Sequence, residues 1–162
     1  MFNIDNIVIK KFENKFSKDF YFLNKSWIEE SWDLEESDKS DLLNPDKIIQ
    51  GGGQVFFAIN NHEVIGTVAM IKNSDKIYEL AKMTVKFNYR GKGIANLLMD
   101  ECIEFASKKN AIEIFLISND SLIVARNLYD KYGFKEVVLD SQKYERGNVK
   151  MILQITTSIL VN

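Results

Sequence analysis

The residues best suited to chemistry lie in a short loop at residues 90–95, where two glycines alternate with two cations (R-G-K-G-I-A). Glycine lets the backbone approach a ligand because no Cβ stands in the way. The segment after the loop has helical spacing, so unpaired N–H groups and the positive end of a helix dipole would face the same ligand. The pattern predicts a cradle for a phosphate group.

A strand before this loop and a helix after it must position the cradle. Residues 80–85 alternate in polarity, which predicts a strand entering a core. Over residues 94–106 the apolar side chains recur every three or four positions, which predicts an amphipathic helix. Cys102 lies on this apolar stripe, so we expect a buried structural thiol.

Three kinds of phosphate-binding loop begin in this way, and two of them fit poorly. A Walker loop needs Lys and then Ser or Thr beside its last glycine, whereas Gly93 is followed by Ile94 and Ala95. A dinucleotide fingerprint needs a small residue where this chain has Asn96. It also needs an acid at the end of the next strand, and Glu113 lies inside that strand, so this match is weak.

The third kind fits residue for residue. Residues 88–93 (N-Y-R-G-K-G) resemble the pyrophosphate signature Q/R-x-x-G-x-G/A of the GNAT N-acetyltransferase superfamily, with Asn88 in place of the usual Gln or Arg. Residues 125–134 (A-R-N-L-Y-D-K-Y-G-F) resemble the family motif A-x-x-L-Y-x-x-x-G-F. A small bacterial-type subgroup, mostly without an assigned substrate, is also similar at residues 24–28, 44–45, 79–83 and 144–151.

The resemblance implies an α/β fold of the mixed-sheet (α+β) kind. It would have about seven mostly antiparallel strands, a splayed central parallel pair and four helices, with residues 1–162 as a single GNAT domain. The patterns predict strands at residues 4–12, 54–59, 63–71, 77–85, 111–118, 134–139 and 149–160. They predict helices at residues 17–31, 44–49 and 94–106 and a last helix ending at 132, with Ser17 as an N-cap and an acidic loop at 33–40.

The resemblance also implies acetyl-coenzyme A (acetyl-CoA) as co-substrate, with its pantetheine arm lying as a pseudo-strand between the two splayed strands. The implied ligands are Met83, Thr84 and Val85 on the strand, Arg90, Gly91, Lys92, Gly93, Ile94 and Ala95 in the loop, and Asn119. The N–H of Val85 would hold the thioester oxygen, where negative charge grows during attack. Two alternatives stay open: the loop cations are simply solvated, and Asn119 caps the following helix.

Two proton transfers accompany acetyl transfer to an amine. Tyr129 occupies the tyrosine position of the family motif and is the implied acid for the departing thiolate; a core aromatic is the alternative. Glu79 lies six residues before Val85, and in a regular strand that even spacing places both side chains on one face. The histone-acetyltransferase branch of the family keeps its glutamate base at this position, although Glu79 is equally expected to pair with Lys82 or a substrate amine while water takes the proton.

The implied function is an N-acetyltransferase that moves the acetyl group of acetyl-CoA to a primary amine by direct attack in a ternary complex. A non-catalytic acyl-CoA binding or sensing module is the alternative. The acceptor is expected to be a small-molecule or peptide amine. Asn24, Trp27 and Tyr144 are candidates for its pocket, although a core position is at least as well supported for Trp27.

Composition excludes several other classes of protein. A net charge of −2 without a long basic run disfavours nucleic acid as a partner. No apolar run approaches the roughly 20 residues of a membrane span, which favours a cytoplasmic protein without a membrane partner. One histidine and one cysteine leave no metal cluster to expect. A homodimer stays open.

Overall fold

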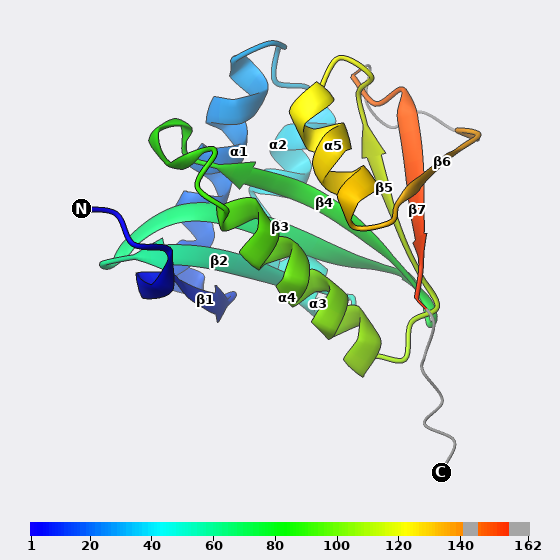
Figure 1. The fold of residues 1–162 in the computed structure, drawn as a ribbon, viewed down its shortest axis with the longest axis horizontal. Helices are drawn as coiled ribbons and strands as arrows, with labels where there is room; N and C mark the ends of the chain where they lie inside the picture. Colours follow the sequence, from blue (N-terminus) through cyan, green and yellow to red (C-terminus); the bar gives the residue numbers. More distant parts are fainter. Residues whose placement is uncertain (141–145, 156–162) are drawn as a thin grey trace.

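The structure is a computed structural model that describes residues 1–140 and 146–155. Its strands are β1 (Val8–Lys11), β2 (Gln54–Asn60), β3 (Glu63–Ser74), β4 (Ile77–Val85), β5 (Glu113–Ser118), β6 (Lys135–Val137) and β7 (Val149–Gln154). They form one seven-stranded sheet in the order β1-β2-β3-β4-β5-β7-β6 (Figure 1). Every neighbouring pair is antiparallel except β4 and β5. The predicted mixed sheet with one parallel pair is confirmed.

Helices cover both faces of this sheet. They are α1 (Ser17–Glu29), α2 (Glu36–Leu42), α3 (Pro45–Gln50), α4 (Ile94–Lys108) and α5 (Ile123–Lys131). On one face, α4 buries Leu98 and Cys102 against Leu116 of β5, and α5 packs at the edge of the same cluster. On the other face, α1 and α2 bury Phe20 and Leu42 in a second cluster. The buried thiol expected at Cys102 is confirmed, and burial raises the pKa of that thiol well above its usual value.

The parallel pair separates after a short contact. Strands β4 and β5 are paired at three positions, the last of which joins Glu79 to Phe115. Beyond this point β4 continues to Val85 beside β3, and β5 continues to Ser118 beside β7. The facing edges of the two strands therefore carry backbone groups without a strand partner, and such groups need a hydrogen-bonding partner if they are buried. The expected splay is confirmed.

A β-bulge in β4 overturns the prediction that Glu79 and Val85 share a face. Lys82 has a φ of +58°, and the register against β3 shifts by one residue at this point. The extra residue reverses the alternation of side chains. Leu80 and Val85 consequently pack against the cluster beneath α4, whereas Glu79 faces the opposite side of the sheet. The even-spacing argument was wrong because no glycine marks the bulge in the sequence.

Three further predictions need correction. Residues 33–40 were predicted to be a loop, but α2 begins there, with a capping box formed by Glu35 and Asp38. Ser17 is the first helical residue of α1 rather than its N-cap, because a 3-10 turn (Asn14–Phe16) leads into the helix. The opening strand is shorter than predicted because residues Ile4–Asn6 form another 3-10 turn. Residues 156–160 of the predicted last strand lie outside the described part.

Candidate active site

Two glycines shape the loop between β4 and α4. Gly91 has a φ of +75° and Gly93 a φ of +88°, a region that side-chain-bearing residues rarely adopt. A Cβ on Gly91 would meet no protein atom within 4 Å, so this side of the loop is open to a ligand. Within the described chain, the N–H groups of residues 91–96 donate to no protein acceptor, and the first bonded amide is that of Leu97. This run of free amides fits an anion such as a diphosphate.

The two loop cations differ in their surroundings. The guanidinium of Arg90 forms a bidentate ion pair with Glu30, at 2.8 and 2.7 Å. Lys92 is exposed, and its Nζ lies 5.4 Å from the centroid of the Phe2 ring. An ion-paired guanidinium attracts a distant anion less than an unpaired one. The predicted electrostatic contribution therefore falls mainly on Lys92.

Backbone directions along β4 decide which amides face the gap. The N–H of Lys86 donates to the Ile65 carbonyl of β3 at 2.8 Å. Successive residues of a strand direct their backbone groups to opposite sides, so those of Val85 face away from β3 and into the gap. The same alternation turns Thr84 towards its β3 partner Thr67. The Val85 N–H therefore faces the gap, and the cofactor contacts of Met83, Thr84 and Val85 stay predictions.

Tyr129 lies on α5 and packs against the cluster beneath α4, with its ring 5.9 Å from that of Phe134. Burial raises the pKa of its hydroxyl to about 12, so the group is protonated at neutral pH. In residues 1–140 and 146–155, no protein group is hydrogen-bonded to this hydroxyl. A protonated hydroxyl without a fixed partner has the chemistry required of a general acid.

Asn119 follows β5 and already has hydrogen-bond partners. Its Oδ1 accepts bonds from the backbone N–H and the hydroxyl of Ser121, at 2.9 and 2.6 Å. Its Nδ2 donates to the Arg146 carbonyl at 2.8 Å. Asn119 does not occupy the N-cap of α5, which is Leu122. The structure gives Asn119 a local role in joining two loops, and its contact with a cofactor stays a prediction.

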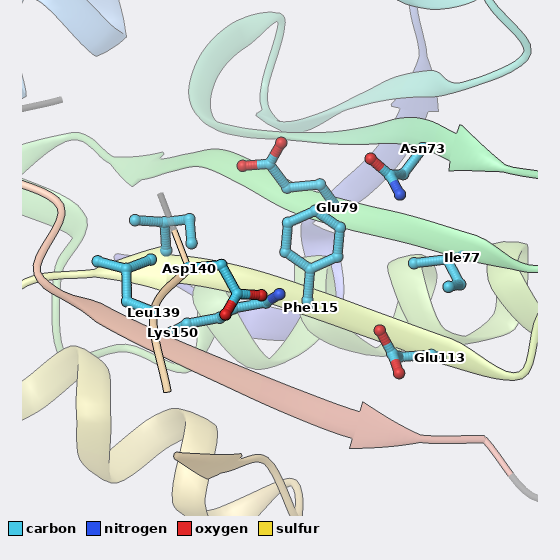
Figure 2. Close-up of a pocket in the computed structure, with 9 residues that line it drawn as sticks. Asn73, Ile77, Glu79, Glu113, Phe115, Leu139, Asp140 and Lys150 are labelled. Carbon is cyan, nitrogen blue, oxygen red and sulfur yellow. The ribbon is translucent and has the colours of Figure 1, made fainter. Parts of the chain in front are cut away.

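A pocket of about 350 Å³ opens on the sheet face opposite α4 and α5 (Figure 2). It is lined by Asn73, Ile77, Glu79, Glu113, Phe115, Ile117, Leu139, Asp140 and Lys150. Glu79 and Phe115 lie side by side at the last pair of β4 and β5. The Nζ of Lys150 lies 5.0 Å from the centroid of the Phe115 ring. The sequence reasoning found only Glu79 of these residues, although the alternation within β5 places 113, 115 and 117 on one face.

The predicted acceptor residues do not gather at this pocket. Asn24 is 2% exposed, and its side-chain amide donates to the Phe20 carbonyl within α1. Trp27 is half-buried in the second core cluster, with its ring 5.7 Å from that of Trp32. Tyr144 lies outside the described residues. Asn24 and Trp27 therefore serve the packing of α1. Contact with an acceptor stays a prediction for Asn24, Trp27 and Tyr144.

A buried ion pair that the sequence reasoning missed joins α2 to the segment just before β7. Asp38 is fully buried and receives two hydrogen bonds from Arg146, which also contacts Glu35 at 3.2 Å. Burial by itself would raise the pKa of Asp38. Hydrogen bonds from Arg146 and from the Glu35 N–H, with the charge of Lys82 nearby, instead hold the pKa below its usual value. This pair fixes α2 on the sheet face that carries the pocket.

No group of three or more His, Cys, Asp or Glu side chains in the described part of the chain is arranged to hold a metal ion. No helix in the same part is both long and apolar enough to cross a membrane. The cytoplasmic location and the homodimer stay predictions.

A mixed sheet that divides between two parallel strands, with free amides at the start of the next helix, is the α/β architecture that the resemblance to the GNAT superfamily implied. The family model described as "Acetyltransferase (GNAT) domain" matches residues 51–136, which is more than half of the chain. The chain belongs to the GNAT acetyltransferase family, as the signature predicted.

Known relatives support this assignment, and they differ in sequence identity and in the share of this chain that they cover. The N-acetylaspartate synthetase of Xenopus tropicalis is 39% identical over 89 residues, 54% of this chain. The chain spans about a third (33%) of the length of that relative. A GNAT family acetyltransferase from Staphylococcus aureus Mu50, named by its family alone, is 26% identical with a TM-score of 0.84, covering 93% of this chain and 99% of that one. This neighbour fits the predicted bacterial-type subgroup without an assigned substrate.

A coenzyme A complex provides a further comparison of the fold. The PaiA N-acetyltransferase of Thermoplasma acidophilum, solved with coenzyme A, has a TM-score of 0.74 at 21% identity, covering 92% of this chain and 99% of that one. At this identity the likeness concerns the fold alone.

Proposed function

We propose that this protein is an N-acetyltransferase that moves the acetyl group of acetyl-CoA to a primary amine by direct attack in a ternary complex. The observation that carries the proposal is the run of free amides at residues 91–96, which begins α4 beside the gap between β4 and β5. Coenzyme A offers a diphosphate for such amides and an extended, amide-bearing arm for such a gap. The coenzyme A complex of a protein with the same fold supports this pairing.

In the proposed complex the loop residues Arg90 to Ala95 hold the diphosphate, mainly through their backbone. The pantetheine arm lies along β4, where it supplies hydrogen-bond partners for edge groups that have no strand partner on β5. The N–H of Val85 donates to the thioester oxygen, and this bond strengthens as negative charge develops during attack. Lys92 adds attraction for the anionic co-substrate.

Two side chains are proposed to move protons. Tyr129 is proposed to donate a proton to the departing thiolate, and its raised pKa means that the hydroxyl carries that proton at neutral pH. Glu79 is proposed as the base, acting directly or through water on an amine that is mostly protonated at neutral pH. Glu79 lines the pocket on the face opposite α4, so the acceptor would approach from that side and acetyl-CoA from the other.

The charge of the pocket bears on the class of acceptor. Three of its lining side chains are acidic (Glu79, Glu113 and Asp140), and one is basic (Lys150). Such a lining favours an amine with a second positive charge and disfavours a dicarboxylate. The relative named N-acetylaspartate synthetase aligns with about half of this chain, so its name does not fix the acceptor here. We therefore propose a cationic amine rather than aspartate.

Release of free thiol from acetyl-CoA, measured with a panel of amines, tests this function. The panel should include a diamine, an amino sugar, a peptide N-terminus and aspartate. We expect release with at least one amine, fastest with the diamine, and a decrease of about 10²-fold for Glu79→Gln, which removes the proposed base. Tight binding of coenzyme A without release of thiol from acetyl-CoA with any amine would contradict the proposed enzymatic function. It would identify an acyl-CoA binding or sensing module instead.

A further inference from the structure

Arg90 makes contacts in two directions from the loop between β4 and α4. Its Nη1 and Nη2 donate to the two carboxylate oxygens of Glu30, at 2.8 and 2.7 Å. Its Nε donates to the backbone carbonyl of Val85 at 2.9 Å. The guanidinium carbon also lies 5.3 Å from the centroid of the Phe87 ring. One side chain thus contacts a helix, a strand end and an aromatic ring.

The contact with Glu30 joins the two helical layers. Glu30 is the C-cap residue of α1, which packs on the sheet face opposite α4. Parallel N–H···O bonds between a guanidinium and a carboxylate fix orientation as well as distance. The pair lowers the pKa of Glu30, so the carboxylate stays charged at neutral pH. The loop before α4 is therefore held in a defined position relative to α1.

The contact with Val85 acts on the edge of the gap. The peptide unit between Val85 and Lys86 is held at both ends, because its carbonyl accepts from Arg90 and its N–H donates to the Ile65 carbonyl at 2.8 Å. This unit adjoins the Val85 N–H, the proposed donor to the thioester oxygen. Small displacements of such a donor cost rate because the reaction depends on its geometry.

We infer that Arg90 and Glu30 are positioning residues that fix the Val85 backbone and join the cofactor loop to α1, and that the Arg90 side chain is not a phosphate ligand. The effect on rate rests on the proposed function. Loss of the ion pair displaces the Val85 N–H. It does not remove the backbone amides of residues 91–96, which are the proposed ligands of the diphosphate. The turnover number therefore falls, while the affinity for coenzyme A changes little.

Four variants test this inference through kcat and through the Kd for coenzyme A. Arg90→Ala, Arg90→Lys and Glu30→Ala should each lower kcat by about tenfold and change Kd by less than about threefold. Lysine fails to rescue because a single ammonium cannot hold both partners. Glu29→Ala is the matched control. Glu29 precedes Glu30 in the chain and forms an exposed ion pair with Lys25. Its removal should leave both kcat and Kd unchanged.

The double variant Arg90→Ala, Glu30→Ala should lower kcat no further than Arg90→Ala alone, because both substitutions break the same ion pair. Three results would overturn the inference: an unchanged kcat in Glu30→Ala, a full rescue by Arg90→Lys, or a Kd raised more than about tenfold in Arg90→Ala. The last result would make the Arg90 side chain a phosphate ligand.

Amide hydrogen exchange separates this inference from the proposed function. The N–H of Lys86 belongs to the fixed peptide unit, so Arg90→Ala and Glu30→Ala should speed its exchange by about tenfold, whereas Glu29→Ala should not. If the wild-type protein releases no thiol with any amine, the proposed function fails. Unchanged exchange at Lys86 in both variants overturns the positioning role, whatever the activity.

Discussion

Protonation of the Tyr129 hydroxyl decides what this residue can do. Burial raises its pKa to about 12, so at neutral pH the group can only give a proton. Tyr132, one turn further along α5, has a different environment, because its hydroxyl donates to Asp100 of α4 at 2.8 Å. The sequence placed Tyr129 in a family motif, but it could not show that only the Tyr132 hydroxyl is hydrogen-bonded to α4, because that partner, Asp100, lies 32 residues away in the chain.

Tyr129→Phe should lower kcat by about 10²-fold and leave the Kd for coenzyme A nearly unchanged, because the lost hydroxyl acts only on the leaving thiolate. Steady-state thiol release and calorimetry measure the two constants. Tyr132→Phe is the matched control, and we expect it to cost about 1 kcal/mol of stability through its bond to Asp100. A kcat for Tyr129→Phe equal to that of the wild type would remove Tyr129 from the mechanism.

At the scale of elements, periodicity predicted the helix α4 and the strands around it well, because apolar side chains mark their buried faces. It failed for α2, since that helix is held by the capping box of Glu35 and Asp38 and by Arg146, which lies far away in the sequence. It also failed for the bulge at Lys82, whose left-handed backbone is not marked by glycine. The loop before α4 was predictable because two glycines do mark it.

Gly93→Ala tests the geometry of that loop. Gly93 is the N-cap of α4 with a φ of +88°, and a side chain in this region costs about 1–2 kcal/mol. We expect that loss of stability in urea unfolding, together with weaker binding of coenzyme A. Gly51→Ala is the control, because its φ of −75° suits any residue; its Cβ would lie 3.3 Å from the Lys47 carbonyl oxygen, so a small loss is expected there as well. Equal losses of stability in the two variants would show that Gly93 is not required for the left-handed conformation of this loop.

Across the whole molecule, the two faces of the sheet have different proposed roles, one in binding acetyl-CoA and the other in binding the acceptor. The face with α4 and α5 borders the loop of free amides, and the opposite face carries the pocket and α2. Asp38 and Arg146, which are far apart in the sequence, hold α2 there through their hydrogen-bonded ion pair. The resemblance predicted the mixed sheet and the splay of its parallel pair, whereas this ion pair needed the folded chain. That residues 1–162 form a single domain stays a prediction.

The stability contributed by Asp38 should depend on pH. Its pKa in the folded protein lies below the usual 3.8, so the contribution is full above that value and is lost as pH falls through the folded pKa. Asp38→Asn should therefore cost about 3 kcal/mol at about pH 7, because it takes the buried carboxylate away from Arg146, and less near pH 3.

Urea unfolding at the two pH values measures this difference. Glu36→Gln, which removes an exposed pair with Lys39, should cost less than about 0.5 kcal/mol and serves as control. A cost for Asp38→Asn that is the same at both pH values would show that its charge is not what stabilises the fold.

Calorimetric titration of the purified protein with coenzyme A tests the central claim most directly, because it asks whether the free amides of residues 91–96 and the gap beside them bind this ligand. We predict one site per chain, a Kd below about 100 μM, and weaker binding for Gly93→Ala. Absence of heat with both coenzyme A and acetyl-CoA at millimolar ligand would contradict the account.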